Sequence, residues 1–265
     1  MKKLRADSPI LLFDSGLGGL TVLAELRAIL PDAPVIYAAD LAGLPYGEKS
    51  EAEVAARVAG LLGRLAERYR PRLACIACNT ASTIALGMVR DVLHIPIVGT
   101  VPAIKPAAAL TKTGVIGLLG TAATIRQKYV DDLEVEFASG KTLIRHAAPE
   151  LVRAAEQKLR GATPDPAIFV ALAETMRAYG GGGNIDTLVL ACTHFPLLEA
   201  ELSAAFGPQV QMVHGAQGIA LRIAHLVAGQ ELAREQKDRF VSTGSPDLAL
   251  APALSTFGLT QTESL

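Results

Sequence analysis

Aromatic side chains and cysteines are scarce in this sequence, and neither sign of charge dominates it. Only 5% of the residues are Phe, Trp or Tyr, which favours helices packed closely on sheets over platforms of stacked aromatic rings. Three cysteines are too few, and odd in number, for a framework of disulfides. We therefore expect reduced thiols and a cytoplasmic location.

A basic surface and a long apolar run are also missing. The formal net charge is −1, without the clustered basic excess that nucleic-acid binding requires. The apolar run near the N-terminus is interrupted by Asp14 and by glycines, so it is too short for a signal peptide or a membrane span. We expect neither nucleic acid nor a membrane among the partners. Half of the 265 residues are hydrophobic, enough to bury the cores of two modest domains.

Short apolar runs alternate with amphipathic segments along the whole chain. The first half predicts strands at 10–13, 35–38, 73–77 and 95–98, and helices at 20–30, 51–69 and 80–93. The pattern then restarts with strands at 115–119, 142–146, 187–191 and 210–213, and helices at 122–132, 149–159, 167–179, 197–206 and 217–227. This alternation predicts an α/β fold with two doubly wound parallel sheets.

One chemical pattern occurs in both halves. The segment Leu73–Ser82 reads as a buried strand that ends at Cys78, and Leu188–Pro196 repeats it with Cys192. Hydrogen-bonding residues follow each cysteine directly. Ligands of open parallel sheets bind beyond the carboxyl ends of the strands. The repeat therefore predicts two pseudo-symmetric domains whose cysteines face each other across an active-site cleft.

Two opposed thiols can act as an acid–base pair. Each cysteine is expected to precede a helix, whose N-terminal N–H groups and dipole stabilise a thiolate. Cys78 and Cys192 could then remove a proton from one face of a carbon and supply one to the other face. The alternative is that both are inert core cysteines.

Two further interpretations of the cysteines compete with this one. Cys75 and Cys78 match a Cys-x-x-Cys redox motif, but residues three apart on a strand point to opposite faces. A structural zinc site from Cys75, Cys78, Cys192 and His194 has the right number of ligands. Its Cys-x-His spacing is poor, and Cys75 again points away from the others.

Asp14 and His194 are the polar candidates beside the cysteines. Asp14 ends a strand and could orient Cys78 or hold an ammonium group; alternatively it caps a helix. His194 could assist Cys192, or could be a capping or core histidine. The segment Asp14–Gly19 lacks the Gly-x-Gly-x-x-Gly order of a dinucleotide site, so a nucleotide is not favoured.

Five motifs, in this order along the chain, resemble the glutamate racemases of the cofactor-independent aspartate/glutamate racemase superfamily. They are Asp14–Gly19, Pro45–Lys49, Ala77–Ser82, Val101–Pro106 and Ala191–Pro196. The tail around Phe240–Pro246 is also similar, which predicts an ordered C-terminal segment.

The resemblance implies interconversion of L- and D-glutamate without pyridoxal phosphate or a metal. It also implies a supply of D-glutamate for peptidoglycan synthesis and a homodimer. The family fold places residues 1–98 in the first domain, rejoined by 214–265, and residues 99–213 in the second.

Residue roles follow from the same resemblance. Cys78 would take the α-proton of D-glutamate and Cys192 that of L-glutamate, supported by Asp14 and His194 respectively. Glu156 resembles a further acidic residue near the second cysteine. The implied substrate-binding residues are Asp14, Ser15, Tyr46, Gly47, Asn79, Thr80, Thr193 and His194.

One position departs from the family pattern. His214–Gly215 replaces an acidic residue that would cap the next helix, which puts the stability of that helix in doubt. Other members of the superfamily act on aspartate, hydantoins or dicarboxylates, and these substrates remain alternatives. So does a zinc-stabilised or ligand-binding α/β module without turnover.

Overall fold

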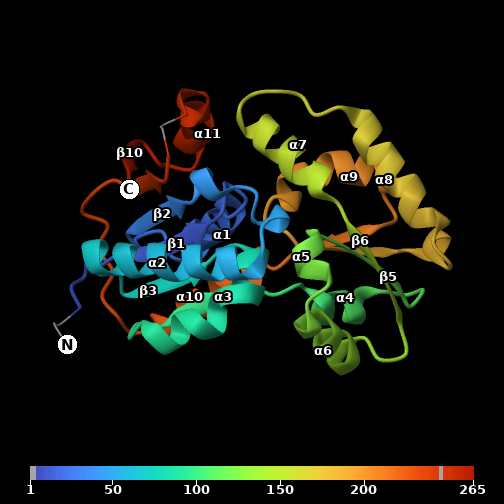
Figure 1. The fold of residues 1–265 in the computed structure, drawn as a ribbon, viewed down its shortest axis with the longest axis horizontal. Helices are drawn as coiled ribbons and strands as arrows, with labels where there is room; N and C mark the ends of the chain where they lie inside the picture. The colour runs from blue at the N-terminus through green and yellow to red at the C-terminus, as the bar shows by residue number, and fades with distance from the viewer. Residues whose placement is uncertain (1–3, 245–246) are drawn as a thin grey trace. The chain divides into compact units, whose positions relative to one another are not determined.

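A computed structural model describes residues 4–244 and 247–265 and divides the chain into two compact units (Figure 1). One unit holds the chain up to Thr100 together with the chain from Ala216 onward, and the other holds Val101–Gly215. Each unit contains one sheet, and every strand pair in both sheets is parallel. The predicted class, two parallel-sheet α/β domains, is confirmed. Ser245 and Pro246 of the tail motif lie outside the described residues.

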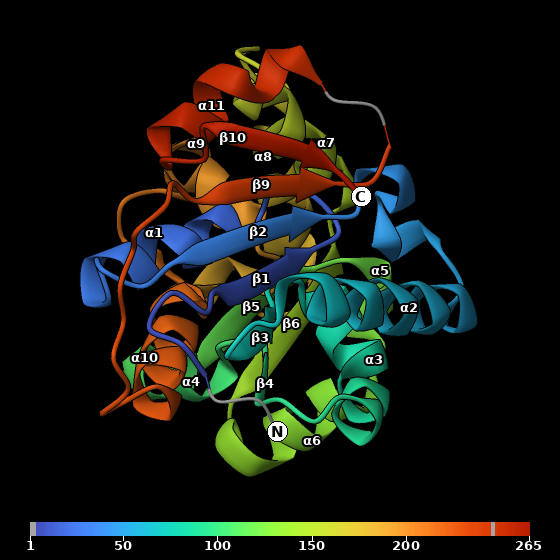
Figure 2. The same cartoon turned by 90° about the vertical axis from the view of Figure 1, so that its left-hand side faces the viewer.

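The first unit has a six-stranded sheet in the order β10-β9-β2-β1-β3-β4 (Figure 2). Its strands are β1 (Ile10–Asp14), β2 (Val35–Ala39), β3 (Leu73–Ile76), β4 (Ile97–Gly99), β9 (Arg239–Ser242) and β10 (Gln261–Ser264). The last two come from the C-terminal segment, where β9 pairs with β2 and β10 pairs with β9. The tail is therefore ordered wherever it is described.

Helices cover this sheet because their apolar residues recur every three or four positions. The helices are α1 (Leu20–Ile29), α2 (Glu51–Tyr69), α3 (Asn79–Val92), α10 (Ala216–Leu226) and α11 (Ala251–Thr256), with 3₁₀ turns at Leu41–Gly43, Tyr46–Glu48 and Leu248–Leu250. In α2, Ser50 caps the first turn, and Val54, Val58 and Leu62 are buried. Helices α2 and α3 share one core with a face of the sheet, and α1 packs against α10.

The second unit has a four-stranded sheet in the order β6-β5-β7-β8. Its strands are β5 (Val115–Gly120), β6 (Thr142–Ala147), β7 (Thr187–Leu190) and β8 (Gln211–Val213). Its helices are α4 (Ile104–Leu110), α5 (Ala122–Ile125), α6 (Lys128–Phe137), α7 (Pro149–Leu159), α8 (Pro166–Ala178) and α9 (Glu199–Phe206), with 3₁₀ turns at Gly182–Asn184 and Phe195–Leu198. Helices α4 and α6 share a core with one face of this sheet.

Helix α10 forms at Ala216 even though His214–Gly215 replaces the acidic cap, and His214 Nε2 lies 4.0 Å from Glu199 Oε2. In the part of the chain that the structure describes, no helix combines the length and the apolar character needed to cross a bilayer.

Candidate active site

Cys78 lies at the carboxyl end of the first sheet. The parallel register sets Phe13 of β1 opposite Ile76 of β3. Asp14, the last residue of β1, and Cys78, which follows β3, therefore come to the same end of the sheet. Cys78 is the N-cap of α3, and its Sγ accepts a hydrogen bond from the Ala81 N–H at 3.5 Å. This N–H belongs to the positive end of the helix, which favours a thiolate.

Ser15 connects Asp14 with the thiol of Cys78. The Ser15 Oγ lies 3.4 Å from the Cys78 Sγ and 3.4 Å from the Asp14 Oδ1. Asp14 also accepts hydrogen bonds from the N–H groups of Ser15 and Gly19, at 2.7 and 2.6 Å, and from the Tyr37 hydroxyl at 3.2 Å. The fully buried carboxylate thus fixes the loop that carries Ser15 against the thiol.

Gly19 is required for this arrangement. A Cβ at this position would lie 2.9 Å from the Ala77 Cβ and 3.0 Å from the Tyr37 hydroxyl. Any larger residue would push the loop away from the end of β3. The glycine therefore lets the Asp14 loop pack closely beside the cysteine.

Tyr46 and Gly47 belong to a loop held by a second buried carboxylate. The Tyr46 hydroxyl donates to Asp40 Oδ2 at 2.6 Å, and Arg57 donates to both oxygens of Asp40 at 2.7 Å. Thr243 Oγ1 donates to Asp40 Oδ1 at 2.6 Å. Desolvation works against the charge of Asp40, but these hydrogen bonds lower its pKa overall. Because its hydroxyl is bound to Asp40, Tyr46 has a structural role in this loop.

Asn79 and Thr80 form the first turn of α3 and are both buried. Within the described residues, the Oδ1 atom of Asn79 is buried without a hydrogen-bond partner. Such an atom costs free energy unless a ligand or water satisfies it. It lies next to Cys78 in the chain and is a candidate acceptor for a substrate ammonium group.

Cys192 follows β7 in the second unit, in the same position relative to its strand as Cys78. Both thiols are nearly buried, with residue exposures of 7% for Cys192 and 6% for Cys78. The prediction of a helix turn directly after Cys192 is wrong, whereas the helix predicted at 197–206 forms as α9. Thr193 and His194 form a turn instead, followed by the 3₁₀ turn Phe195–Leu198 and only then by α9. Pro196 has no N–H to donate, so this turn differs from the start of α3.

The imidazole of His194 lies beside the second thiol in place of a helix terminus. His194 Nδ1 is 3.8 Å from the Cys192 Sγ, and His194 Nε2 is 2.8 Å from Glu156 Oε1. Arg160 donates to the other Glu156 oxygen, Oε2, at 2.6 Å. The four side chains form a continuous series that ends at the thiol.

Electrostatics favour a charged His194. Burial by itself lowers the pKa of a histidine, but the hydrogen bonds to Cys192 and Glu156 outweigh it and raise the pKa of His194 well above its ordinary value. An imidazolium next to Cys192 stabilises its thiolate. The charged form of the partner of the second thiol is therefore favoured, whereas Ser15 gives the first thiol a neutral partner.

Cys75 belongs to the scaffold. It occupies the strand position between Ala74 and Ile76, so its side chain faces the other side of the sheet from their core. Burial, and after it the charge of Asp14, raises the pKa of the Cys75 thiol. All three cysteines are free. No group of three or more His, Cys, Asp or Glu side chains among residues 4–244 and 247–265 is placed to hold a metal ion.

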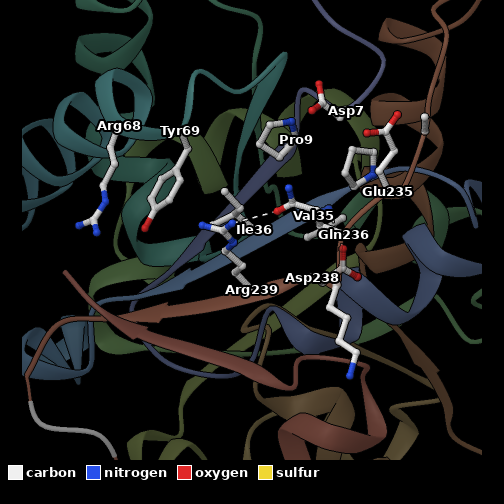
Figure 3. A pocket seen from close by; sticks show the side chains of 13 residues that line it. Asp7, Pro9, Val35, Ile36, Arg68, Tyr69, Glu235, Gln236, Asp238 and Arg239 are labelled. Atoms are coloured by element: carbon white, nitrogen blue, oxygen red, sulfur yellow. Dashed lines mark hydrogen bonds between the residues drawn. The ribbon is translucent and has the colours of Figure 1, made fainter.

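A separate pocket of about 210 Å³ lies at the opposite edge of the first sheet (Figure 3). Its lining includes Pro9, Val35 and Arg239, which stand at the amino ends of β1, β2 and β9. Cys78 stands at the carboxyl end of its strand. This pocket is therefore not the place of the cysteine chemistry.

Comparison with known proteins identifies the family. The sequence model of the Asp/Glu/Hydantoin racemase family matches residues 21–222. The chain belongs to this family. A glutamate racemase of Sphingopyxis alaskensis is 65% identical over 224 residues, which make up 84% of each chain. The predicted resemblance and the predicted enzyme class, an amino-acid racemase, are confirmed.

Solved structures of this racemase family agree with the comparison of sequences. The Escherichia coli glutamate racemase, crystallised with L-glutamate and the activator UDP-MurNAc-Ala, superposes with a TM-score of 0.89. It is 38% identical, and the match covers 97% of this chain and 98% of that one. The Francisella tularensis enzyme, in complex with D-glutamate, gives a TM-score of 0.79 at 25% identity, with 98% of both chains covered.

Two contacts of the candidate site were not expected from the sequence. Arg160 was not singled out, although its i,i+4 spacing from Glu156 on a helix is a signal for an ion pair. The contact between Asp40 and Tyr46 joins neighbouring loops through side chains, which no periodic pattern reveals.

Proposed function

We propose that this chain interconverts L- and D-glutamate by a two-base mechanism with Cys78 and Cys192. The main support is that each thiol ends a parallel strand and has its own polar partner, Ser15 or His194. The names of the similar proteins, and the glutamate bound in two of the solved structures, support the choice of substrate.

The proposed reaction moves two protons. In the direction from D to L, the Cys78 thiolate takes the α-proton and the Cys192 thiol gives a proton to the opposite face of the carbanion. The reaction leaves a thiol on Cys78 and a thiolate on Cys192, and the reverse direction exchanges these roles. The mechanism requires both thiols to act on one α-carbon.

The remaining side chains hold the substrate and stabilise the carbanion. We assign Ser15, Asn79, Thr80, Thr193 and the backbone at Gly47 to binding, and the free Oδ1 of Asn79 to the ammonium group. An amino-acid α-proton is very weakly acidic, so hydrogen-bond donors must stabilise charge that develops on the carboxylate. The N–H groups at the start of α3 and the threonine hydroxyls are suitable donors.

The biological setting is part of this proposal. D-glutamate made by this chain would serve peptidoglycan synthesis in the cytoplasm of a bacterium. We further propose a homodimer as the working form.

Isotope labelling tests the mechanism directly. Each glutamate enantiomer is incubated with the protein in deuterated water, and optical rotation and α-deuterium are followed. We expect loss of rotation with one α-deuterium incorporated, and we expect Cys78→Ala and Cys192→Ala to abolish it. Normal racemisation by both variants would contradict the two-base assignment.

Cys75→Ala is the matched control, because Cys75 lies three residues before Cys78, in β3, and its thiol faces the other side of the sheet. It is expected to racemise glutamate at the normal rate. Parallel incubations with aspartate enantiomers test the main alternative substrate of the superfamily. Faster turnover of aspartate than of glutamate would overturn the assignment of the substrate.

A further inference from the structure

The contacts of Arg160 point to a role that extends to the second thiol. Its guanidinium donates to Glu156 Oε2 at 2.6 Å and to the Glu156 backbone carbonyl at 2.7 Å. The other carboxylate oxygen, Oε1, lies 2.8 Å from His194 Nε2, and His194 Nδ1 lies 3.8 Å from the Cys192 Sγ. We propose that Arg160 is a positioning residue for Cys192, because it fixes the Glu156 carboxylate that orients the His194 ring.

The direction of the hydrogen bonds follows from the chemistry of the groups. An ionised carboxylate only accepts, so Glu156 fixes His194 with a proton on Nε2. His194 Nδ1 then shares one further proton with Cys192. This proton sits on sulfur in the thiol–imidazole form and on nitrogen in the thiolate–imidazolium form. An ionised, well-oriented Glu156 favours the second form.

Loss of Arg160 would weaken the contact between the Glu156 carboxylate and His194. The Glu156 side chain is only 8% exposed, so removal of the Arg160 charge makes its ionised form less favourable, and the carboxylate would gain a proton more readily or turn toward solvent. Either change removes the acceptor from His194 Nε2. Arg160 is 31% exposed, so water screens its direct repulsion of His194, and the loss of the acceptor dominates.

Other charged groups surround the same turn. They are Lys158 on α7, Glu199 and Glu201 on α9, and His214 before α10. Lys158 pairs with Glu201 at 2.6 Å, and His214 lies 4.0 Å from Glu199. Lys158 also donates to the Leu197 carbonyl at 2.9 Å, so it contacts the same turn but binds a different carboxylate from Arg160. Its replacement therefore shows what the loss of a nearby cation and of a contact to the turn does by itself.

This inference rests on the proposed function, but its test does not need turnover. The alkylation rate of each cysteine with iodoacetamide, resolved by mass spectrometry of the peptides, is measured against pH, because only the thiolate displaces iodide. The midpoint of such a profile is the pH at which the alkylation rate of a cysteine is half of its maximum. For Arg160→Gln we expect this midpoint to rise by about one pH unit for Cys192, which means a roughly tenfold loss of thiolate at any pH below the midpoint. Cys78 contacts Ser15 and Ala81 in the other unit, so its midpoint should stay unchanged.

Three variants separate positioning from a general effect. Arg160→Lys keeps the positive charge, so the dependence of Cys192 alkylation on pH should stay close to that of the wild type. Lys158→Gln should leave it unchanged. Glu156→Gln, which keeps the shape of the side chain, should raise the Cys192 midpoint as Arg160→Gln does, and it serves if Arg160→Gln fails to fold.

The outcomes distinguish this inference from the proposed function. An unchanged Cys192 midpoint in both Arg160→Gln and Glu156→Gln overturns the role of Arg160, even if the wild type racemises glutamate. An equal shift in Lys158→Gln also overturns it, because the loss of any nearby cation or contact to the turn would then suffice. A selective shift in a protein that does not racemise glutamate supports the positioning role and contradicts the proposed function alone.

Discussion

The two thiols have different partners at the scale of single residues. Cys78 receives a helix N–H and touches the Ser15 hydroxyl, whereas Cys192 touches an imidazole. A hydroxyl can donate to a thiolate or accept from a thiol, but it carries no charge. An imidazolium carries a full positive charge. The raised pKa of His194 therefore favours an ionic partner at the second thiol, whereas the partner of the first thiol is neutral.

Replacement of Ser15 tests the neutral contact. Ser15→Ala removes the hydroxyl that contacts the Cys78 thiol, a hydrogen bond worth about 1 kcal/mol, so kcat/KM should fall about fivefold. The fall should be equal for L- and D-glutamate, because two enantiomers have the same free energy in water. Racemisation followed by circular dichroism measures both directions. Ser15→Thr keeps the hydroxyl and is the control, and an unchanged rate in Ser15→Ala would show that the contact is unimportant.

At the scale of elements, loops are held by buried carboxylates. Asp40 is fully buried and accepts from Tyr46, Arg57 and Thr243, which come from a loop, a helix and the segment after β9. A buried carboxylate is tolerated only when hydrogen bonds satisfy both oxygens. Asp40 therefore couples the loop of Gly47 to the C-terminal segment.

The hydroxyl of Tyr46 should matter for stability and not for turnover. Tyr46→Phe leaves one hydrogen-bond position of the buried Asp40 unfilled, so we expect a loss of about 1–2 kcal/mol in the free energy of unfolding. The rate of racemisation at a temperature where the variant is folded should remain normal, since the hydroxyl faces Asp40. Urea unfolding and an assay with saturating glutamate measure the two properties. A large loss of turnover without a loss of stability would instead assign the hydroxyl to the substrate.

The carboxylate of Asp186 likewise holds a loop of the second unit through hydrogen bonds. It accepts from the Thr111 hydroxyl and from the N–H groups of Lys112 and Thr113, at 2.6 to 2.8 Å. Desolvation opposes its charge, but these hydrogen bonds lower the pKa of Asp186 from 3.8 to about 2. A carboxylate with a lowered pKa stabilises the fold above its unfolded pKa, and this contribution disappears as the pH falls through its folded pKa.

The loss of stability caused by Asp186→Asn should therefore depend on pH. At pH 7 we expect a loss of about 1–2 kcal/mol in the free energy of unfolding, after allowance for solvent screening. The difference from wild type should narrow as the pH falls from about 4 to about 2. Urea unfolding across this pH range measures the difference in the free energy of unfolding between the wild type and the variant. A difference that stays constant down to pH 2 would mean that the charge of Asp186 does not stabilise the unit.

Most helices and strands of this chain could be predicted because the spacing of apolar residues along the sequence indicates which positions are buried. The strand before Cys78 and the helix of Glu51–Tyr69 follow from their apolar spacing alone. The short helix α4 was not predicted, because its seven residues, which include Pro106, are too few to show a helical spacing of apolar residues. The turn after Cys192 was misjudged because Pro196 changes how the following helix begins. The contact of Arg160 with Glu156 depends on rotamers, which the sequence does not encode locally.

At the scale of the whole molecule, each unit has its own sheet and carries one of the two thiols. The chain leaves the first unit after Thr100 and returns to it at Ala216. The proposed mechanism needs Cys78 and Cys192 at one α-carbon. If the chain is a homodimer, the two thiols at one carbon could belong to one chain or to two.

Mixing two inactive variants distinguishes these cases. If both thiols of a site come from one chain, Cys78→Ala and Cys192→Ala cannot complement each other, and the mixture should stay inactive after unfolding and refolding together. If a site combines units of two chains, half of the refolded dimers would be mixed, and each would hold one intact site. About a quarter of the wild-type activity would then return. We expect no return of activity, because two passages of the chain, after Thr100 and before Ala216, tether the two units of one chain to each other. Refolded wild type, assayed in parallel, controls for losses in the procedure.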